Sequence, residues 1–301
     1  MGADIRIILL DLLVERSEFG HGGNQEIIAP ISEYGSVEVL LVTPQMQTIE
    51  AGDRAQKEGI VRISEGDVPN WDYDFPFWEE CTMEISGNEV RFKRIAVPVH
   101  GDDSRTAIWL DGLKPDAVVC SGSRKNVTMW EEWMDSGASI LRCSANMGIP
   151  TIGICFGHQL LCKALGATVE RADSLSNGVW DLNLTNDGDE DEIFASRRSG
   201  AGDSPVVLFT HQDHVMSVPD CCNLLGSTVH NGVTAVRVLD DVGSPLPAWG
   251  VQFHPEAAKA RVERAFEWGH ITEDELESFR REHDGAGILG SFAAVVIRNQ
   301  A

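Results

Sequence analysis

The segment from Gly148 to Leu161 constrains the fold more than any other part of this chain. An apolar strand leads into a lone cysteine, Cys155, flanked by Gly153 and Gly157, and a helical pattern follows at once. This is the arrangement of a nucleophile elbow, in which the glycines permit a sharp turn between strand and helix. A thiol at a helix N-terminus ionises more readily, because the peptide dipoles favour the thiolate. Cys155 is therefore a candidate nucleophile, with an inert core cysteine as the alternative.

Apolar runs without polar alternation recur through the first half of the chain, with helical stretches between them. The predicted strands are Ile5–Leu13, Val37–Thr43, Val90–Val97, Ala117–Cys120 and Thr151–Cys155, and the clearest helices are Trp130–Asn146 and Gly157–Leu165. This alternation predicts an α/β fold: a doubly wound, mostly parallel central sheet with helices on both faces. In such sheets functional residues gather at the carboxyl ends of the strands.

The second half of the chain predicts a smaller antiparallel portion and a helical tail. Short strands are predicted at Thr168–Glu170, Trp180–Thr185, Val206–Phe209, Leu224–Thr228, Val233–Val238 and Ala248–Phe253. Residues Asn186–Glu192 are predicted to form a solvated loop. We expect residues 1–256 to form one domain and residues 257–301 to be a C-terminal helical extension packed on it. In that extension we expect a helix to about Trp268, a capping box at Thr272 and an interruption at Gly285–Gly290.

A second motif, Trp249–Glu256, supplies the partners that a nucleophilic thiol needs. This short apolar strand ends in His254, Pro255 and Glu256. An imidazole takes the proton of the thiol and later protonates the leaving amine. A carboxylate holds the imidazole tautomer and stabilises its cation. Cys155, His254 and Glu256 are thus predicted to form a catalytic triad.

Together these two motifs resemble the signature of class I glutamine amidotransferases, whose domains have a flavodoxin-like fold. The resemblance runs from about Pro115 to Glu256. It implies oxyanion donors in the backbone N–H groups of Ser123 and Phe156, although Gly122-Ser-Arg stands where the family usually has Gly-Gly-Pro. It also implies a set of residues that contact the glutamine substrate: Gly122, Gln159, His211, Gln212, Asp213 and His214. A polar surface loop is the alternative for His211 and His214. A metal site including Cys155 lacks ligands at suitable spacing.

The resemblance implies hydrolysis of glutamine through a γ-glutamyl thioester, with ammonia passed to a partner synthetase or synthase. No Walker-type nucleotide loop occurs, so ATP chemistry is expected on another polypeptide. No cofactor and no metal are expected. Two alternatives remain: a γ-glutamyl amide or peptide hydrolase without nitrogen transfer, and a non-catalytic regulatory subunit on the same fold.

The net charge of −23 argues against binding to nucleic acid or to an anionic membrane. Seven cysteines without C-x-x-C spacing argue against a disulfide framework, and a thiolate nucleophile favours a reducing cytoplasm. Acidic residues Asp4 and Asp11 border the first apolar run, so no signal peptide is expected there. Adaptation to high salt is one hypothesis for the charge, and a melting temperature that does not rise between low and molar KCl would contradict it. An ordinary acidic protein is the other.

Residues 44–89 form an atypical insert whose role the sequence leaves open. The segment contains an aromatic group near two prolines: Trp71, Tyr73, Phe75, Phe77 and Trp78. Such a group is typical of a local core, and a lid over the active site is the alternative.

Overall fold

The structure is a computed structural model of the 301-residue chain. It describes residues 5–13, 17–46, 61–63, 69–71, 80–95, 97–98, 101–197, 204–267, 269 and 271–300. The expected aromatic core or lid lies outside the described residues. Between residues 47 and 79 the structure describes only the backbone of two short strands, β3 (Val61–Ile63) and β4 (Pro69–Trp71).

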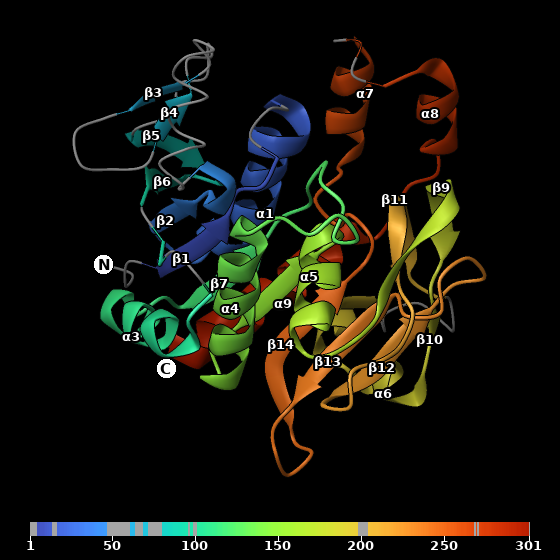
Figure 1. The fold of residues 1–301 in the computed structure, drawn as a ribbon. Helices are drawn as coiled ribbons and strands as arrows, with labels where there is room; N and C mark the ends of the chain where they lie inside the picture. The colour runs from blue at the N-terminus through green and yellow to red at the C-terminus, as the bar shows by residue number, and fades with distance from the viewer. Residues whose placement is uncertain are drawn as a thin grey trace.

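Within the described residues one large sheet organises the molecule (Figure 1). Its strands follow the order β10 (Asn183–Leu184), β12 (Cys222–Ser227), β13 (Ala235–Leu239), β14 (Pro245–Val251), β8 (Thr151–Ile154), β7 (Ala117–Cys120), β1 (Ile5–Leu10), β2 (Val37–Val42), β6 (Asn88–Arg94) and β5 (Glu80–Ile85). The strands from β14 to β6 are parallel, whereas the pairs at the two ends are antiparallel. The predicted mostly parallel sheet is confirmed.

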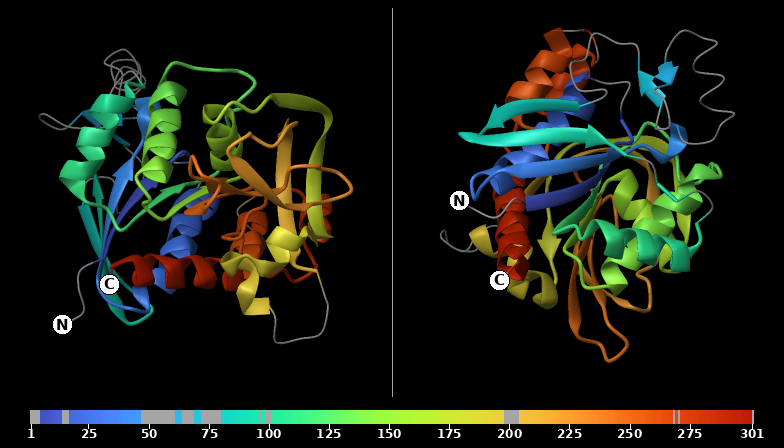
Figure 2. Two further views of the ribbon diagram at one scale, coloured as in Figure 1. Left: turned by 90° about the horizontal axis from the view of Figure 1, so that it is seen from below. Right: turned by 90° about the vertical axis from the view of Figure 1, so that its left-hand side faces the viewer.

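Helices cover both faces of this sheet, as predicted (Figure 2). Strand β1 shows the division, because Ile7 and Leu9 belong to one apolar cluster and Ile8 and Leu10 to another. The first cluster includes residues of α1 (Gly23–Ser32) and α9 (Gly285–Gln300). The second includes residues of α3 (Asp103–Leu113), α4 (Trp133–Asn146) and α5 (Phe156–Ala164). The molecule is therefore a three-layer α/β sandwich.

A separate two-stranded antiparallel sheet stands beside the carboxyl edge of the main sheet. It pairs β9 (Val169–Asp181) with β11 (Val206–Val215), and the register shifts between His211 and Asp213. The sequence predicted only the ends of β9, and it ended the strand that begins at Val206 at Phe209. The residues after Phe209 instead continue β11, because their backbone pairs with β9 on both sides of the register shift, Thr210 and His211 with Asn177 and Ser176, and Asp213–Val215 with Val169–Arg171.

The tail contains α7 (Lys259–Glu267), α8 (Glu273–Ser278) and α9. The predicted first helix and the capping box at Thr272 are confirmed. The predicted interruption at Gly285–Gly290 is wrong, since α9 runs unbroken to Gln300. A Cβ at Gly285 would lie 2.2 Å from the carbonyl oxygen of Pro255, so this glycine permits close packing.

The loop predicted at Asn186–Glu192 is also wrong in part, because α6 (Asn186–Glu190) occupies most of it. The Thr185 side chain caps this helix by accepting a hydrogen bond from Gly188 N–H. A Cβ on Gly188 would lie 1.9 Å from the carbonyl oxygen of Leu225. The acidic segment is therefore helical because its cap and its glycine fit the neighbouring strand.

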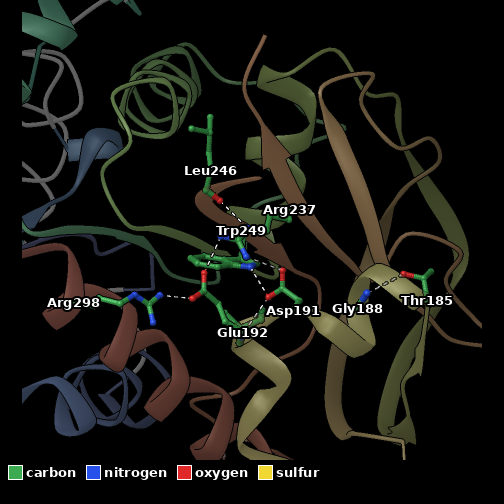
Figure 3. Close-up of polar contacts among 9 residues, drawn as sticks. Thr185, Gly188, Asp191, Glu192, Arg237, Leu246, Trp249 and Arg298 are labelled. Atoms are coloured by element: carbon green, nitrogen blue, oxygen red, sulfur yellow. Dashed lines mark hydrogen bonds and ion pairs between the residues drawn. The ribbon is translucent and has the colours of Figure 1, made fainter. Parts of the chain in front are cut away.

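A partly buried ionic group, here called the Arg237 cluster, joins α9 to the sheet (Figure 3). It consists of Asp191, Glu192, Arg237, Trp249 and Arg298. Arg237 donates to Asp191 at 3.0 Å and to Glu192 at 2.8 Å, and its guanidinium lies 4.4 Å from the centre of the Trp249 ring. Arg298 on α9 donates to the other oxygen of Glu192.

No described helix is both long and apolar enough to span a lipid bilayer.

Candidate active site

The elbow around Cys155 has the geometry that its glycines require. Cys155 connects β8 to α5 and has φ 50° and ψ −99°, a conformation that a non-glycine residue rarely adopts. A Cβ at Gly153 would lie 2.5 Å from the carbonyl oxygen of Gly157, and a Cβ at Gly157 would lie 2.5 Å from that of Cys120. Strain of this kind costs about 1–3 kcal/mol and persists only where the surroundings enforce it. The elbow therefore holds its sulfur in one defined position.

Cys155, His254 and Glu256 meet at the carboxyl ends of β8 and β14. The Nδ1 atom of His254 lies 2.8 Å from Oε1 of Glu256. Gly122, which follows β7, lies close to both His254 and Cys155. A Cβ built there would lie 2.9 Å from Cε1 of His254 and 3.9 Å from the Cβ of Cys155. All three triad side chains are largely buried. The Cys155 thiol lies 3.9 Å from the Thr210 carbonyl oxygen, and Nε2 of His254 is buried without a hydrogen-bond partner.

The surroundings of His254 favour its protonated form. Burial of the ring disfavours the cation, but the Cys155 sulfur and the Glu256 carboxylate outweigh burial and raise the pKa of His254 well above its ordinary value. The imidazole is thus prepared to hold a proton between the other two groups.

The two predicted oxyanion residues lie beside the sulfur on different elements. Phe156 occupies the first position of α5, where a helical N–H has no acceptor within its own helix. Ser123 follows β7, and its hydroxyl donates to the Leu12 carbonyl at 3.1 Å and accepts from Lys125 N–H at 3.1 Å. These bonds hold the turn in place despite its departure from the usual family sequence. Both residues line the same cavity as Cys155.

Gln159 and Asp213 form one buried network at the cavity wall. The Gln159 amide donates to the Asp213 carbonyl oxygen at 2.8 Å and to the Gln252 side chain at 3.2 Å. The Asp213 carboxylate accepts from Thr128 N–H at 2.9 Å and from its hydroxyl at 2.7 Å, and lies 3.6 Å from Arg171. The amide of Gln159 is therefore committed to the backbone of β11.

The other candidate substrate residues differ in where they face. His211 and Gln212 line the cavity, whereas His214 lines a separate hollow with Glu170 and His230. Both ring nitrogens of His211 are buried without a hydrogen-bond partner. Desolvation, helped by the neighbouring His214, lowers the pKa of His211 to about 2, so this ring is neutral at ordinary pH.

The cavity above the triad has a volume of about 370 Å³, within the range of small-molecule sites. Several of its wall residues have no counterpart among the sequence predictions. They are Leu13, Arg124, Lys125, Asn126, Arg171, Leu175, Leu208, Thr210, Ala257, Val262, Ile271, Glu275 and Phe279. Part of this wall comes from α7, α8 and the residues that border them. Arg124, Lys125, Asn126 and Thr210 adjoin residues that the sequence singled out. No local motif signals the wall residues of α7 and α8, which lie far from the elbow in sequence.

Comparison with known proteins identifies the family. The sequence profile described as Glutamine amidotransferase class-I matches residues 84–266, more than half of the chain. The chain belongs to the class I glutamine amidotransferases. One relative is a subunit of the glutamine-hydrolysing GMP synthase of Methanothermobacter thermautotrophicus. It is 37% identical over 120 residues, which are 40% of this chain and 58% of that protein.

Other relatives of this amidotransferase extend the likeness. The glutamine-hydrolysing GMP synthase of Brachyspira hyodysenteriae is 25% identical over 212 residues, which are 63% of this chain and 38% of that protein. The chain thus spans less than two thirds of these curated relatives. A solved glutamine amidotransferase from Methylobacillus flagellatus has a TM-score of 0.58 at 16% identity, over 99% of this chain and 95% of that one.

The glutaminase domain of Trypanosoma brucei CTPS, solved with bound acivicin, has a TM-score of 0.55 at 12% identity. The match covers 98% of this chain and 94% of the Trypanosoma brucei chain. At these identities the structural neighbours establish the fold alone.

Proposed function

We propose that this amidotransferase hydrolyses the side-chain amide of glutamine through Cys155, His254 and Glu256. The observation that carries the proposal is the position of His254, which lines the same cavity as Cys155 and has its Nε2 atom buried without a hydrogen-bond partner. Its Nδ1 atom lies 2.8 Å from Glu256. Such a row of thiol, imidazole and carboxylate is the arrangement that acyl transfer requires. The family and the glutamine-hydrolysing relatives support the same reaction.

The first half of the reaction forms an acyl-enzyme. The Cys155 thiolate attacks the side-chain amide carbon, and the carbonyl π electrons move onto its oxygen. The N–H groups of Ser123 and Phe156 donate to that oxyanion. When the intermediate collapses, the C–N bond breaks and the nitrogen takes the proton from His254. Ammonia leaves, and a γ-glutamyl thioester remains on Cys155.

The second half releases glutamate. Water gives a proton to His254 as it attacks the thioester, and the C–S bond breaks to restore the thiolate. Glu256 holds the imidazole tautomer and stabilises its cation in both halves. His211, Gln212 and Asp213 contact the α-amino and α-carboxylate groups of the substrate from the cavity wall, with His214 behind them. Gly122 gives the amide room beside His254, and Gln159 supports this wall.

The ammonia passes to a partner synthetase or synthase in the cytoplasm. This part of the proposal draws on the GMP synthase relatives, one of which is named as a separate subunit of that enzyme. The strongly acidic surface is compatible with a protein partner rather than with nucleic acid.

The test compares Cys155→Ala with Cys143→Ala, a matched loss of one buried sulfur in α4. We expect Cys155→Ala to lower ammonia release by at least about 10⁴-fold, because no other group replaces the nucleophile. Cys143→Ala keeps its activity. Acivicin is expected to modify Cys155, as read by mass spectrometry of the intact and digested protein. Substantial activity in folded Cys155→Ala would refute the nucleophile, and a folded wild type that never releases ammonia from glutamine would refute the substrate.

A further inference from the structure

His158 is a buried polar residue for which the proposed reaction has no role. It lies on α5, three residues after Cys155, and its side chain is fully buried. Its Nε2 atom lies 3.0 Å from the carbonyl oxygen of Val233, just before β13. Cys162, one turn further along α5, places its sulfur 3.7 Å from Nδ1. The ring therefore joins the nucleophile helix to the antiparallel part of the sheet.

Burial determines the protonation of this ring. It lowers the pKa of His158 to about 4, although backbone groups of Val233 and Gly250 oppose the shift. A neutral imidazole carries one proton, and the Val233 carbonyl requires that proton on Nε2. Burial also raises the pKa of Cys162, so its thiol keeps the hydrogen that it can offer to Nδ1. Both nitrogens of His158 thus have a neutral partner and a single favoured tautomer.

Gly250 on β14 packs directly against the His158 ring. A Cβ at this position would lie 2.6 Å from Nδ1 of His158, so only glycine fits without displacement. The next residue, Val251, accepts a hydrogen bond from the Cys155 N–H at 2.8 Å. His254 follows three residues later. The contact between His158 and Gly250 therefore lies between the residue that carries the thiol and the strand that carries the imidazole.

We propose that His158 is a positioning residue, which with Gly250 as its matched partner sets the separation between the Cys155 thiol and the His254 ring. The inference rests on the proposed function. It explains how the strained backbone of Cys155 is kept in register with β14, because a strained residue persists only where its neighbours enforce it. It also links the two sequence motifs through one contact, the histidine of the first against the glycine of the second.

The main experiment replaces His158 by Leu, which has a similar volume and no hydrogen bonds, and by Gln, which retains a donor. We expect His158→Leu to lower kcat by about 100-fold with little change in KM, since a small misplacement near the reacting atoms has an effect of that size. The rate of Cys155 alkylation by iodoacetamide is expected to rise at a higher pH than in the wild type, because the thiol loses its alignment with the imidazole. His158→Gln recovers most of both losses.

A double-mutant cycle with Gly250 tests the matching directly. Gly250→Ala pushes a methyl group against His158 and lowers kcat, whereas Gly250→Ala combined with His158→Ser is expected to be several-fold more active than independent effects allow. Thermal melts and circular dichroism verify that each variant is folded. If folded His158→Leu melts earlier but keeps the kcat and alkylation profile of the wild type, His158 is a packing residue and the inference is overturned. Strictly additive effects would overturn the matching with Gly250.

Failure of the proposed function has a different signature. It would appear as a wild type without glutaminase activity and with a Cys155 no more reactive than Cys143. A failure of the inference alone leaves the wild type fully active.

Discussion

The candidate active site and the Arg237 cluster both contain charged groups that are at least partly buried, but they differ in how fully their polar atoms are hydrogen-bonded. In the Arg237 cluster, Arg237 contacts two carboxylates and the Leu246 carbonyl, and Asp191 also accepts from Trp249 at 3.0 Å (Figure 3). In the active site, His211, Asp213 and Glu256 each keep at least one buried polar atom without a hydrogen-bond partner.

This difference in hydrogen bonding indicates that the Arg237 cluster contributes to stability and the active site to function. An unmade hydrogen bond on a buried group costs about 1–3 kcal/mol, so the active site lowers the stability of the chain while keeping groups that a substrate can engage. The Arg237 cluster instead uses its polar groups to tie α9 to the sheet. Substitutions in the two regions should therefore affect different measurements.

The largest expected contrast comes from making the same substitution, Glu to Gln, once in the active site and once in the Arg237 cluster. We expect Glu256→Gln to lower kcat by about 10³-fold, because an amide no longer stabilises the imidazolium and favours the wrong tautomer. Its melting temperature should stay close to that of the wild type. Glu192→Gln should show the reverse, with normal kcat and a loss of about 0.5–1 kcal/mol in the free energy of unfolding, because solvent screens this partly exposed carboxylate. Equal effects of both variants on kcat would erase the distinction.

Removing the central cation should cause the largest loss of stability. Arg237→Met leaves Asp191 buried without its ion-pair partner, which costs about 3–5 kcal/mol in the free energy of unfolding. Urea unfolding at neutral pH measures the loss, and ammonia release per folded molecule is expected to be unchanged. The control, Arg280→Met, removes an exposed pair with Glu277 and should change stability by less than about 0.5 kcal/mol. An Arg237→Met protein as stable as the wild type would show that this ion pair contributes nothing to the free energy of unfolding.

Acid should act on the active site through His211. Because the folded protein holds the pKa of this ring at about 2, the unfolded chain takes up a proton below about pH 6.5 and the folded chain does not. Stability therefore falls as the pH drops, by about 2 kcal/mol for this imidazole between pH 7 and pH 5. His211→Leu should show a shallower decline in urea unfolding and a higher KM for glutamine. Parallel pH profiles for the two proteins would contradict the assignment.

Local sequence was sufficient wherever the chain's own residues decide the conformation. Gly153 and Gly157 around Cys155 predicted the elbow, and the apolar runs predicted the parallel strands, because both signals depend on neighbouring residues. The predicted break at Gly285–Gly290 failed for the opposite reason. Glycine disfavours a helix in isolation, but here the tight contact with Pro255 and the packing of Phe292 in the core outweigh that preference.

Local patterns were enough to place the parallel strands along the chain, to indicate the family and to predict the chemical types of the candidate triad. The residues that surround those groups follow only from the folded chain: Arg171 from β9, Glu275 from α8, and the ring of His158 against Gly250. The cause of this division is separation along the chain. A strand, a cap or a turn is stabilised by residues a few positions apart, whereas a cavity wall forms where segments far apart in the sequence exclude the same water.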